Sequence, residues 1–289
     1  MSILAIELGG TTTVLSFFTD GNVFSPSIVH EFPTTSPSEV FAQIINVCSS
    51  HKISKIGVAS FGPIEINQSS PCFATITNTP KIPFQQFNLA NSLKIFNVPI
   101  FVDTDVNAAA RAEFNVRSVV QNHPITSLAY VTIGTGIGVG FCFSPSRPSL
   151  NFEGGHIFAP LHPNDVENNF EGVCPFHSKC IEGMANAASI AKRAGCEPRD
   201  LCNLPDDHEV FDVAAHYYAH LCLSICLLTR TDVIVIGGGV FKRQSLMPRV
   251  VKLFDKLLNG YLTDVKGTDL LQRPLLQHSG LVGAALLTM

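Results

Sequence analysis

Seven residues of the chain, CPFHSKC at positions 174–180, combine side chains that often bind transition metals. Cys174, His177 and Cys180 recur at every third position. Thiolate sulfur and imidazole nitrogen are ligands that Zn²⁺ prefers, and a closed structural zinc site needs four of them. The stretch therefore predicts three ligands of a zinc site whose fourth ligand comes from elsewhere. A redox-active cysteine pair and ordinary packing residues are the alternatives.

Two short segments rich in glycine and threonine could bind phosphate groups. GGTTT at 9–13 and GTG at 134–136 each follow an apolar run, and such turns let backbone N–H groups and threonine hydroxyls approach phosphate oxygens. Either segment alone is equally typical of a tight hairpin. A third segment, GGG at 237–239, ends another apolar run and favours a nucleotide site, although no P-loop motif occurs. The candidate nucleotide-binding residues are Gly9, Gly10, Thr11, Thr12, Gly134, Thr135, Gly136, Gly237, Gly238 and Gly239.

An acidic loop separates a predicted strand from a predicted helix in VPIFVDTDVNAAARAEF, residues 98–114. Open α/β sheets bind ligands at the carboxyl ends of their strands, which is where this loop lies. Asp105 stands near the start of the Ala-rich helix, whose dipole favours an anion. From these residues alone, Asp105 is either a ligand-binding residue or a helix cap.

Composition indicates a globular protein with small-molecule partners. The 289 residues, 46% of them hydrophobic, suit one bilobed or two ordinary domains. The formal net charge is −4 and no dense Lys/Arg run occurs, so we expect neither nucleic-acid nor membrane-surface binding. We find no basic leader and no apolar run of the roughly 18–20 residues that a membrane span needs, which predicts a cytoplasmic protein. There the nine scattered cysteines are expected to stay reduced.

The order of apolar runs predicts an internal repeat. Segments 2–18 and 128–143 both read as a hairpin with a glycine-containing turn. Each is followed by an apolar strand that ends in glycine, at 55–63 and 231–240. The chain therefore folds, on this interpretation, into two similar α/β halves.

The expected halves are residues 1–117, joined by a C-terminal helix at about 278–289, and residues 118–277. Within the second half, residues 144–180 are rich in Pro, Asn, Gly and His and show little periodicity. They predict a long ordered loop, and loops of that length are usually functional or disordered.

Six motifs, in order along the chain, resemble those of the ROK (repressor, open reading frame, kinase) family of sugar kinases. They are IELGGTTT, DTDVNAAARAE, VTIGTGIGVG, the E-x-G-H at 153–156, CPFHSKCIEG and VIGGGV. The family belongs to the actin-like, hexokinase-like ATPases. The resemblance thus implies a two-lobed α/β fold of duplicated ribonuclease H-like domains and a homodimer that phosphorylates a hexose hydroxyl with ATP. With HP-x-D at 162–165, the cysteine motif is most similar to the zinc-containing fructokinase branch, which implies a zinc-binding loop and D-fructose as the substrate.

Other activities stay open within and beyond the kinase class. A mannokinase or a broad glucokinase differs from a fructokinase by a few hydroxyl contacts. The family also includes sugar-responsive repressors with an N-terminal helix-turn-helix, for which a sheet that begins at residue 3 leaves no room. A non-catalytic sugar sensor is disfavoured by Asp105 and by the two Gly/Thr turns.

The resemblance implies a role for individual residues around the sugar. Asp105 matches the catalytic base, which accepts the proton of the sugar hydroxyl while its oxygen attacks the γ-phosphoryl group. Thr104 stands beside the base, where many relatives carry Asn. The other residues implied as sugar contacts are Gly62, Pro63, Glu153, His156 and Glu182.

The resemblance also implies the metal ligands. Glu7 matches the acidic position that holds Mg²⁺ directly or through water. His156 matches the fourth zinc ligand, beside Cys174, His177 and Cys180. Besides Thr104, two positions depart from the family pattern: Thr12 replaces a common Lys in the phosphate turn, and Phe84 replaces a Trp that forms an aromatic wall beside the sugar.

Overall fold

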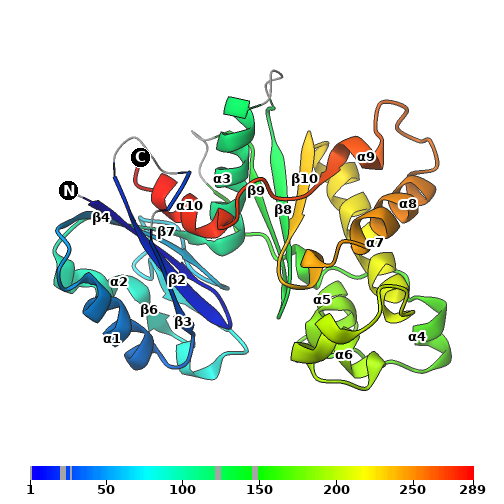
Figure 1. Ribbon diagram of the computed structural model, residues 1–289, viewed down its shortest axis with the longest axis horizontal. Coiled ribbons are helices and arrows are strands. Elements are labelled where there is room, and N and C mark those ends of the chain that lie inside the picture. Colours follow the sequence, from blue (N-terminus) through cyan, green and yellow to red (C-terminus); the bar gives the residue numbers. More distant parts are fainter. Residues whose placement is uncertain (1, 20–23, 27, 121–124, 145–148) are drawn as a thin grey trace. The chain divides into compact units, whose positions relative to one another are not determined.

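The computed structural model describes residues 2–19, 24–26, 28–120, 125–144 and 149–289. Contacts within the chain divide it into two compact units, coloured along the sequence in Figure 1. The units are Met1–Pro124 with Gly140–Asn151 and Leu275–Met289, and Ile125–Val139 with Phe152–Pro274.

The first unit is built on a five-stranded sheet in the order β3-β2-β1-β4-β7. β1 pairs antiparallel with β2 and β2 with β3, whereas β1, β4 and β7 run parallel. The hairpin predicted at 2–18 is therefore present. The strands are β1 (Ser2–Leu8), β2 (Thr12–Phe18), β3 (Val29–Pro33), β4 (Ile53–Ser60) and β7 (Ile100–Thr104).

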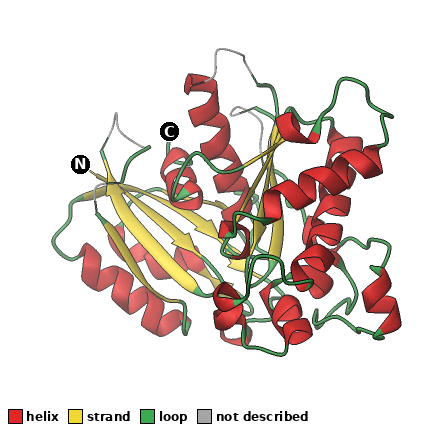
Figure 2. Ribbon diagram, turned by 45° about the vertical axis from the view of Figure 1, so that its right-hand side comes forward, coloured by secondary structure: helices red, strands yellow, loops and turns green. Residues whose placement is uncertain are grey.

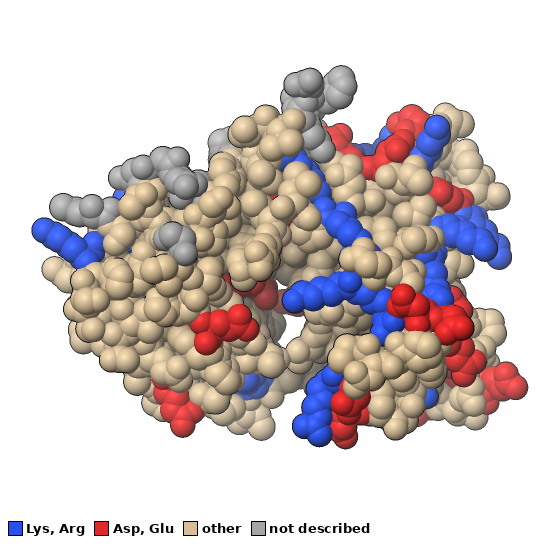
Figure 3. Space-filling model, viewed as in Figure 1, with Lys and Arg blue, Asp and Glu red and all other residues tan. Residues whose placement is uncertain are grey.

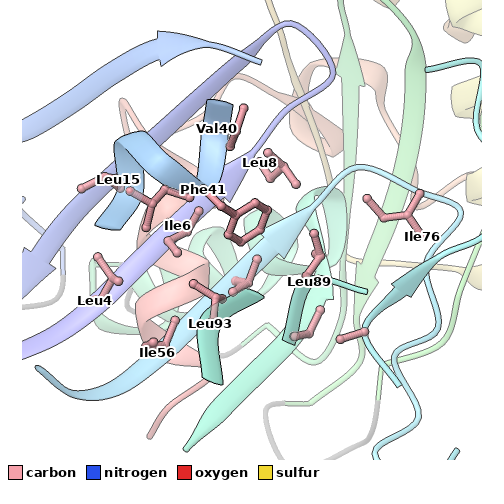
Figure 4. Close-up of a cluster of buried hydrophobic side chains, with 14 of the residues drawn as sticks. Leu4, Ile6, Leu8, Leu15, Val40, Phe41, Ile56, Ile76, Leu89 and Leu93 are labelled. Carbon is pink, nitrogen blue, oxygen red and sulfur yellow. The ribbon is translucent and has the colours of Figure 1, made fainter. Parts of the chain in front are cut away.

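One face of this sheet packs against two helices. Leu4, Ile6 and Leu8 of β1 point into a core closed by α1 (Pro37–Cys48) and α2 (Leu89–Leu93), as Figure 4 shows. Alternate strand residues share a face, so the apolar run of β1 supplies a side chain to this core at every second position. A proline in the first turn pre-sets the backbone of α1 for a helix.

The opposite face of the sheet packs against the C-terminal helix. Ile3 and Ala5 share a hydrophobic cluster with residues of α3 (Asp105–Val120) and α10 (Ser279–Leu286), and these two helices lie against each other. Small residues let these helices approach closely, and the tail predicted to be helical is indeed α10. By the same alternation, Glu7 faces the α10 side.

The second unit repeats the strand order of the first. Its sheet runs β11-β10-β8-β9, which matches β7-β4-β1-β2, and β8, β10 and β11 are parallel. The internal repeat predicted from glycine-ended strands is therefore present. The strands, yellow in Figure 2, are β8 (Leu128–Ile133), β9 (Ile137–Cys142), β10 (Val233–Gly237) and β11 (Leu271–Gln272).

Two long helices pack side by side in the second unit, α7 (Val210–Thr229) and α8 (Leu246–Leu258). Among the described residues, α7 alone has the length and apolar composition of a membrane span, so the expectation that no such run exists was wrong. Two thirds of its apolar window is buried inside the protein, as in a core helix. The remaining elements are β5 (Thr75–Ile76), β6 (Phe87–Asn88), α4 (Pro163–Glu167), α5 (Ile181–Ala185), α6 (Ala187–Ala194) and α9 (Gly267–Leu270).

Two local expectations differ from the structure. The predicted acidic loop after the strand does not exist, because β7 ends at Thr104 and α3 begins at Asp105. The predicted loop 144–180 contains α4 and a 3₁₀ turn at Gly154–His156, although positions 145–148 lie outside the described residues.

Charged side chains of both signs are intermixed on the face of the second unit shown in Figure 3. Several form exposed pairs, such as Arg230 with Asp264. Exposed pairs of this kind contribute little to stability.

Candidate active site

Three predicted motifs follow strands that end at one edge of the first sheet. Leu8 of β1 pairs with Ser60 of β4, which pairs with Thr104 of β7, so these parallel strands end level with one another. The first Gly/Thr turn, Gly62–Pro63 and Asp105 come within three residues of these ends. Open α/β sheets place their ligands at this edge.

The start of α3 presents Asp105 without using it as the N-cap. The cap is Thr104, whose hydroxyl oxygen accepts the Asn107 N–H at 3.1 Å. Oδ1 of Asp105 accepts the Val106 N–H at 2.9 Å. Because a carboxylate offers about four lone-pair sites, this bond leaves the half-buried Asp105 able to accept a further proton donor.

A second carboxylate, Asp103, is buried directly beside this corner. It accepts hydrogen bonds from the Thr104 N–H at 2.8 Å and from Nδ2 of Asn107 at 2.9 Å. The Ser149 hydroxyl donates to its other oxygen. Burial raises the pKa of Asp103, and these hydrogen bonds oppose the rise. Asp103 therefore shapes the backbone on which Asp105 stands.

The same network holds the segment 149–151 against α3. Nδ2 of Asn107 also donates to the Leu150 carbonyl at 3.0 Å, and its Oδ1 accepts the Phe141 N–H at 3.2 Å. Nδ2 of Asn151 donates to the Ile64 carbonyl at 3.0 Å, next to Gly62–Pro63. One buried asparagine thus joins α3, β9 and the segment that leads to the E-x-G-H motif.

Protein donors bind the carbonyl oxygens of the first Gly/Thr turn. The Gly9 oxygen accepts the Thr34 hydroxyl at 2.8 Å, and the Thr11 oxygen accepts the Thr34 N–H at 2.8 Å. The Gly10 oxygen accepts the Lys81 ammonium at 2.9 Å. The Gly9 N–H is engaged as well, because it donates to the Thr12 carbonyl at 3.0 Å. Protein partners thus fix the backbone of a Gly-rich turn, a kind of segment that binds phosphate in other proteins.

Glu7 lies under the N-terminus of α10. Its carboxylate accepts the Leu281 N–H, and a Cβ on Gly280 would lie 2.5 Å from its carboxyl carbon, so a larger residue there would displace the Glu7 carboxylate. Burial raises the pKa of Glu7 to about 7, which the Leu281 hydrogen bond opposes. A carboxylate oxygen is a ligand type that Mg²⁺ prefers, and one hydrogen bond leaves lone pairs for the metal or its water.

The second turn repeats the pattern of engaged carbonyls. The Gly134 oxygen accepts the Ala187 N–H at 2.9 Å, and the Thr135 oxygen accepts Nδ2 of Asn186 at 3.1 Å. A Cβ on Gly134 would lie 3.8 Å from the Gly239 nitrogen, so the GTG and GGG segments are neighbours.

The GGG segment needs glycine at its centre. Gly238 has φ of +93° and lies against the backbone of Ile133, where any side chain would overlap. Gly237 packs on Tyr130, while Gly239 has open space around it. The structure therefore brings the two predicted nucleotide segments of the second unit together.

Three predicted sugar contacts gather beside β9 in the second unit. Oε2 of Glu182 accepts the Ile137 N–H at 2.9 Å. The E-x-G-H turn lies on the same strand, because Gly155 packs directly on the Ile137 carbonyl. Glu153 is exposed as a whole residue, but burial of its carboxyl group raises the pKa of that group. The charge of Glu182 raises this pKa further, and the charge of His156 lowers it.

The four predicted zinc ligands converge. The ligand atoms of His156, Cys174, His177 and Cys180 all lie within 4.8 Å of one another. Nδ1 of His156 lies 3.5 Å from Sγ of Cys180 and 3.8 Å from Sγ of Cys174, which is 3.9 Å from Nδ1 of His177. Tetrahedral Zn²⁺, with bonds of about 2.3 Å to sulfur and about 2.0 Å to nitrogen, spaces such atoms roughly 3.6 Å apart. The donor set and its spacing therefore fit zinc.

A histidine cluster, His162, His216 and His220, lies outside the metal ligands. Ring centroids are 5.2 Å apart for His162 and His216, and 4.6 Å apart for His216 and His220. Nδ1 of His162 accepts the Asn164 N–H and caps α4, so three of the four HP-x-D positions are helical. Burial lowers the pKa of His162 and of His220, and His216 lowers both further.

The structure decides where the side chain of Phe84, which replaces the common Trp, is placed. Phe84 is fully buried and packs edge-on against Phe61 and Phe87, at centroid distances of 5.4 and 6.0 Å. Its ring belongs to the core of the first unit and cannot form an aromatic wall beside a ligand. The adjacent Ile82, with 75% of its surface exposed, occupies the outside of the same turn.

Some features of the site escaped the sequence analysis. Thr104 was expected beside the base, but its role as N-cap was not, although a Thr at the start of an Ala-rich run is a recognisable N-cap signal. Nothing in the local pattern pointed to Asn107, Ser149 or Lys81, because their partners lie 34, 46 and 71 residues away.

Comparison with families of known proteins identifies the family of this chain. The ROK family model matches residues 3–289. The chain belongs to the ROK family. The resemblance inferred from the six motifs is thereby confirmed, as is the α/β fold expected for a ROK hexokinase-like protein.

Individual proteins match along almost the whole chain. A fructokinase from Streptococcus mutans is 34% identical over 281 residues, which cover 96% of this chain and 92% of that protein. A fructokinase from Lactococcus lactis subsp. cremoris is 33% identical over 264 residues, covering 89% and 86%. The structure of a ROK family glucokinase from Streptomyces griseus, in complex with glucose and AMPPNP, superimposes with a TM-score of 0.75 at 19% identity, covering 99% of this chain and 98% of that one.

Proposed function

We propose that the protein is an ATP-dependent hexose kinase that converts D-fructose to D-fructose 6-phosphate. The observation that carries the proposal is the 33–34% identity to two fructokinases over nearly their whole length. The level strand ends of the first sheet and the paired glycine segments of the second support the same reaction, since they present a carboxylate and anion-binding backbone.

Asp105 is the general base in this proposal. As the 6-hydroxyl oxygen of fructose bonds to the γ-phosphorus, the bond between that phosphorus and the β-bridging oxygen breaks and ADP leaves. The hydroxyl proton passes to the Asp105 carboxylate, which is held by Thr104 and the Asp103 network at a strand end. Thr104, Gly62, Pro63, Glu153, His156 and Glu182 are the proposed sugar contacts.

The glycine segments of each unit are the proposed nucleotide-binding residues. Protein donors hold carbonyls of both Gly/Thr turns, and turns of this kind can offer their remaining backbone N–H groups to phosphate oxygens. Glu7 would hold Mg²⁺ through water, since its carboxylate is already oriented by the Leu281 N–H. When bound, Mg²⁺ supplies positive charge to the transferring phosphoryl group.

His156, Cys174, His177 and Cys180 would hold one structural Zn²⁺, which ties the predicted loop to the site. Nδ1 of His156 faces the two sulfurs, so Nε2 is the nitrogen left for a sugar hydroxyl. In this arrangement the thiolates orient the His156 ring, and the ring orients the sugar.

We further propose a cytoplasmic homodimer whose functional lobes are 1–117 with 278–289, and 118–277. Size-exclusion chromatography with light scattering measures the oligomeric state, and a mass of one 31.2 kDa chain contradicts the dimer.

A coupled ADP-release assay over a panel of hexoses tests the function. We expect kcat/KM to be highest for fructose, while a preference for glucose or mannose would move the protein to the alternative kinase activity. Asp105→Asn keeps the side-chain shape but cannot take the proton, so kcat should fall by about 10²- to 10⁴-fold with sugar binding retained. An Asp105→Asn enzyme within about threefold of wild type removes Asp105 from the base role. If the protein binds sugar but phosphorylates no hexose, the result favours a non-catalytic sugar sensor.

A further inference from the structure

A lysine from a distant loop reaches the first Gly/Thr turn. Nζ of Lys81 lies 2.9 Å from the Gly10 carbonyl oxygen, across 71 residues of sequence. The Lys81 backbone is well anchored, because its N–H donates to the buried Thr79 hydroxyl at 3.3 Å and its carbonyl accepts the Phe84 N–H at 2.9 Å. The ammonium also lies 5.9 Å from the centroid of the buried Phe84 ring. The core of the first unit therefore aims this side chain at the turn.

Within the described part of the chain, this ammonium has no counterion. No carboxylate of the described residues forms an ion pair with Lys81. Partial burial lowers its pKa, and no acidic group counteracts that shift. A half-buried positive charge that meets a neutral carbonyl and the face of an aromatic ring is an incomplete arrangement that an anion would complete.

Holding the turn does not require a positive charge. In the second turn a neutral amide donates to the corresponding carbonyl: Nδ2 of Asn186 lies 3.1 Å from the Thr135 oxygen. The chain itself thus shows that an uncharged donor can engage such a carbonyl. The charge at Lys81 is therefore left for another partner.

We propose that Lys81 is a phosphate-binding residue that contacts the terminal phosphate of the nucleotide at the first Gly/Thr turn. This inference rests on the proposed kinase function and adds a cation that no motif of the sequence indicated. An ammonium group carries three N–H donors, so Lys81 can keep its bond to Gly10 while it donates to a phosphate oxygen. Its charge also stabilises the negative charge on the transferring phosphoryl group.

The test compares nucleotide binding in four proteins: wild type, Lys81→Gln, Lys81→Arg and Lys55→Gln. Glutamine keeps an N–H donor without the charge, and arginine keeps the charge. Lys55 is the matched control, because its ammonium also donates to a carbonyl, that of Thr288 at 2.8 Å, away from the turn. Calorimetry measures binding of a non-hydrolysable ATP analogue and of adenosine to each.

We expect Lys81→Gln to bind the ATP analogue about 10- to 100-fold more weakly, the range typical of one charge-assisted hydrogen bond, with adenosine affinity unchanged. Lys81→Arg should recover part of the loss, and Lys55→Gln should match wild type. In turnover, Lys81→Gln should raise KM for ATP and lower kcat without changing KM for fructose.

Two results overturn the assignment of Lys81. One is a Lys81→Gln protein that binds the ATP analogue within about twofold of wild type. The other is an equal loss for the analogue and adenosine, which would indicate a distorted turn. The binding comparison needs no turnover, so a wild type that binds the analogue but phosphorylates no hexose would refute the proposed function and still decide the role of Lys81.

Discussion

Removing one carboxylate from the interior of the first unit should cost a large part of its stability. Glu113 and Arg117 lie one turn apart on α3, form a 2.9 Å ion pair and have side chains with no exposed surface. Oε2 of Glu113 also accepts the Leu275 N–H at 3.0 Å. Oε1 accepts the Leu276 N–H at 3.0 Å and the Ser279 hydroxyl at 2.8 Å. Three of its four partners thus belong to the segment that begins α10.

Glu113→Gln keeps the size of the side chain and removes its charge. The amide nitrogen of Gln takes the place of one carboxylate oxygen, so its N–H groups face two donors that had bonded to that oxygen. The Arg117 guanidinium also stays buried after the Glu113 carboxylate is lost. Breaking a buried ion pair from one side costs about 3–5 kcal/mol. Since a domain is stable by roughly 5–15 kcal/mol, we expect Glu113→Gln to lower the free energy of unfolding by about 3–5 kcal/mol.

Urea unfolding followed by circular dichroism measures this loss. Adding Arg117→Met to Glu113→Gln removes the stranded charge, so the double variant should be more stable than Glu113→Gln alone. Asp264→Asn is the control, because it breaks the exposed pair with Arg230 and should change stability by about 1 kcal/mol or less. A Glu113→Gln loss below about 1 kcal/mol, or a double variant less stable than the single, would refute this account of the buried pair.

Three further predictions concern the zinc ligands, the base corner and pH. Wild-type protein should contain about one zinc per chain, and Cys180→Ala should lose both the zinc and the affinity for sugar. Cys142→Ala, which changes a buried cysteine of β9, should keep both. Elemental analysis and sugar titration measure these effects, and a fully active Cys180→Ala protein would contradict the metal site. Ser149→Ala frees one oxygen of Asp103 and should lower kcat about tenfold with little change in KM for ATP, whereas unchanged kcat would show that the Ser149 contact does not position the base. In the histidine cluster, the pKa values of His162 and His220 are lowered, so the unfolded chain binds more protons than the folded protein below pH 6.5, and the free energy of unfolding should decrease as the pH drops from 7 toward 5. Urea unfolding of His216→Gln should show a smaller decrease over the same pH range. A decrease equal to that of wild type would exclude His216 as a cause.

The amino-acid sequence by itself determined the features whose parts lie close together along the chain. CPFHSKC places three predicted ligands within seven residues, so the convergence of Cys174, His177 and Cys180 needs only a local turn. The hairpins around the Gly/Thr turns and the Ala-rich α3 likewise follow from period and turn chemistry over fewer than 20 residues. Family membership rested on the same local motifs, taken in order.

Only the tertiary structure decided which side chains from distant segments meet. Phe84 and Ile82 are two positions apart, yet one is core and the other is exposed, because a 3₁₀ turn packs only one of them against the first sheet. From the local sequence, Glu113 is typical of a surface carboxylate on an amphipathic helix. In the structure it is buried and accepts a hydrogen bond from Ser279 of α10, which lies 166 residues later in the sequence. Lys81 reaches Gly10 for the same reason: long-range contacts depend on how the strands bring loops together at one sheet edge, and no local periodicity records that.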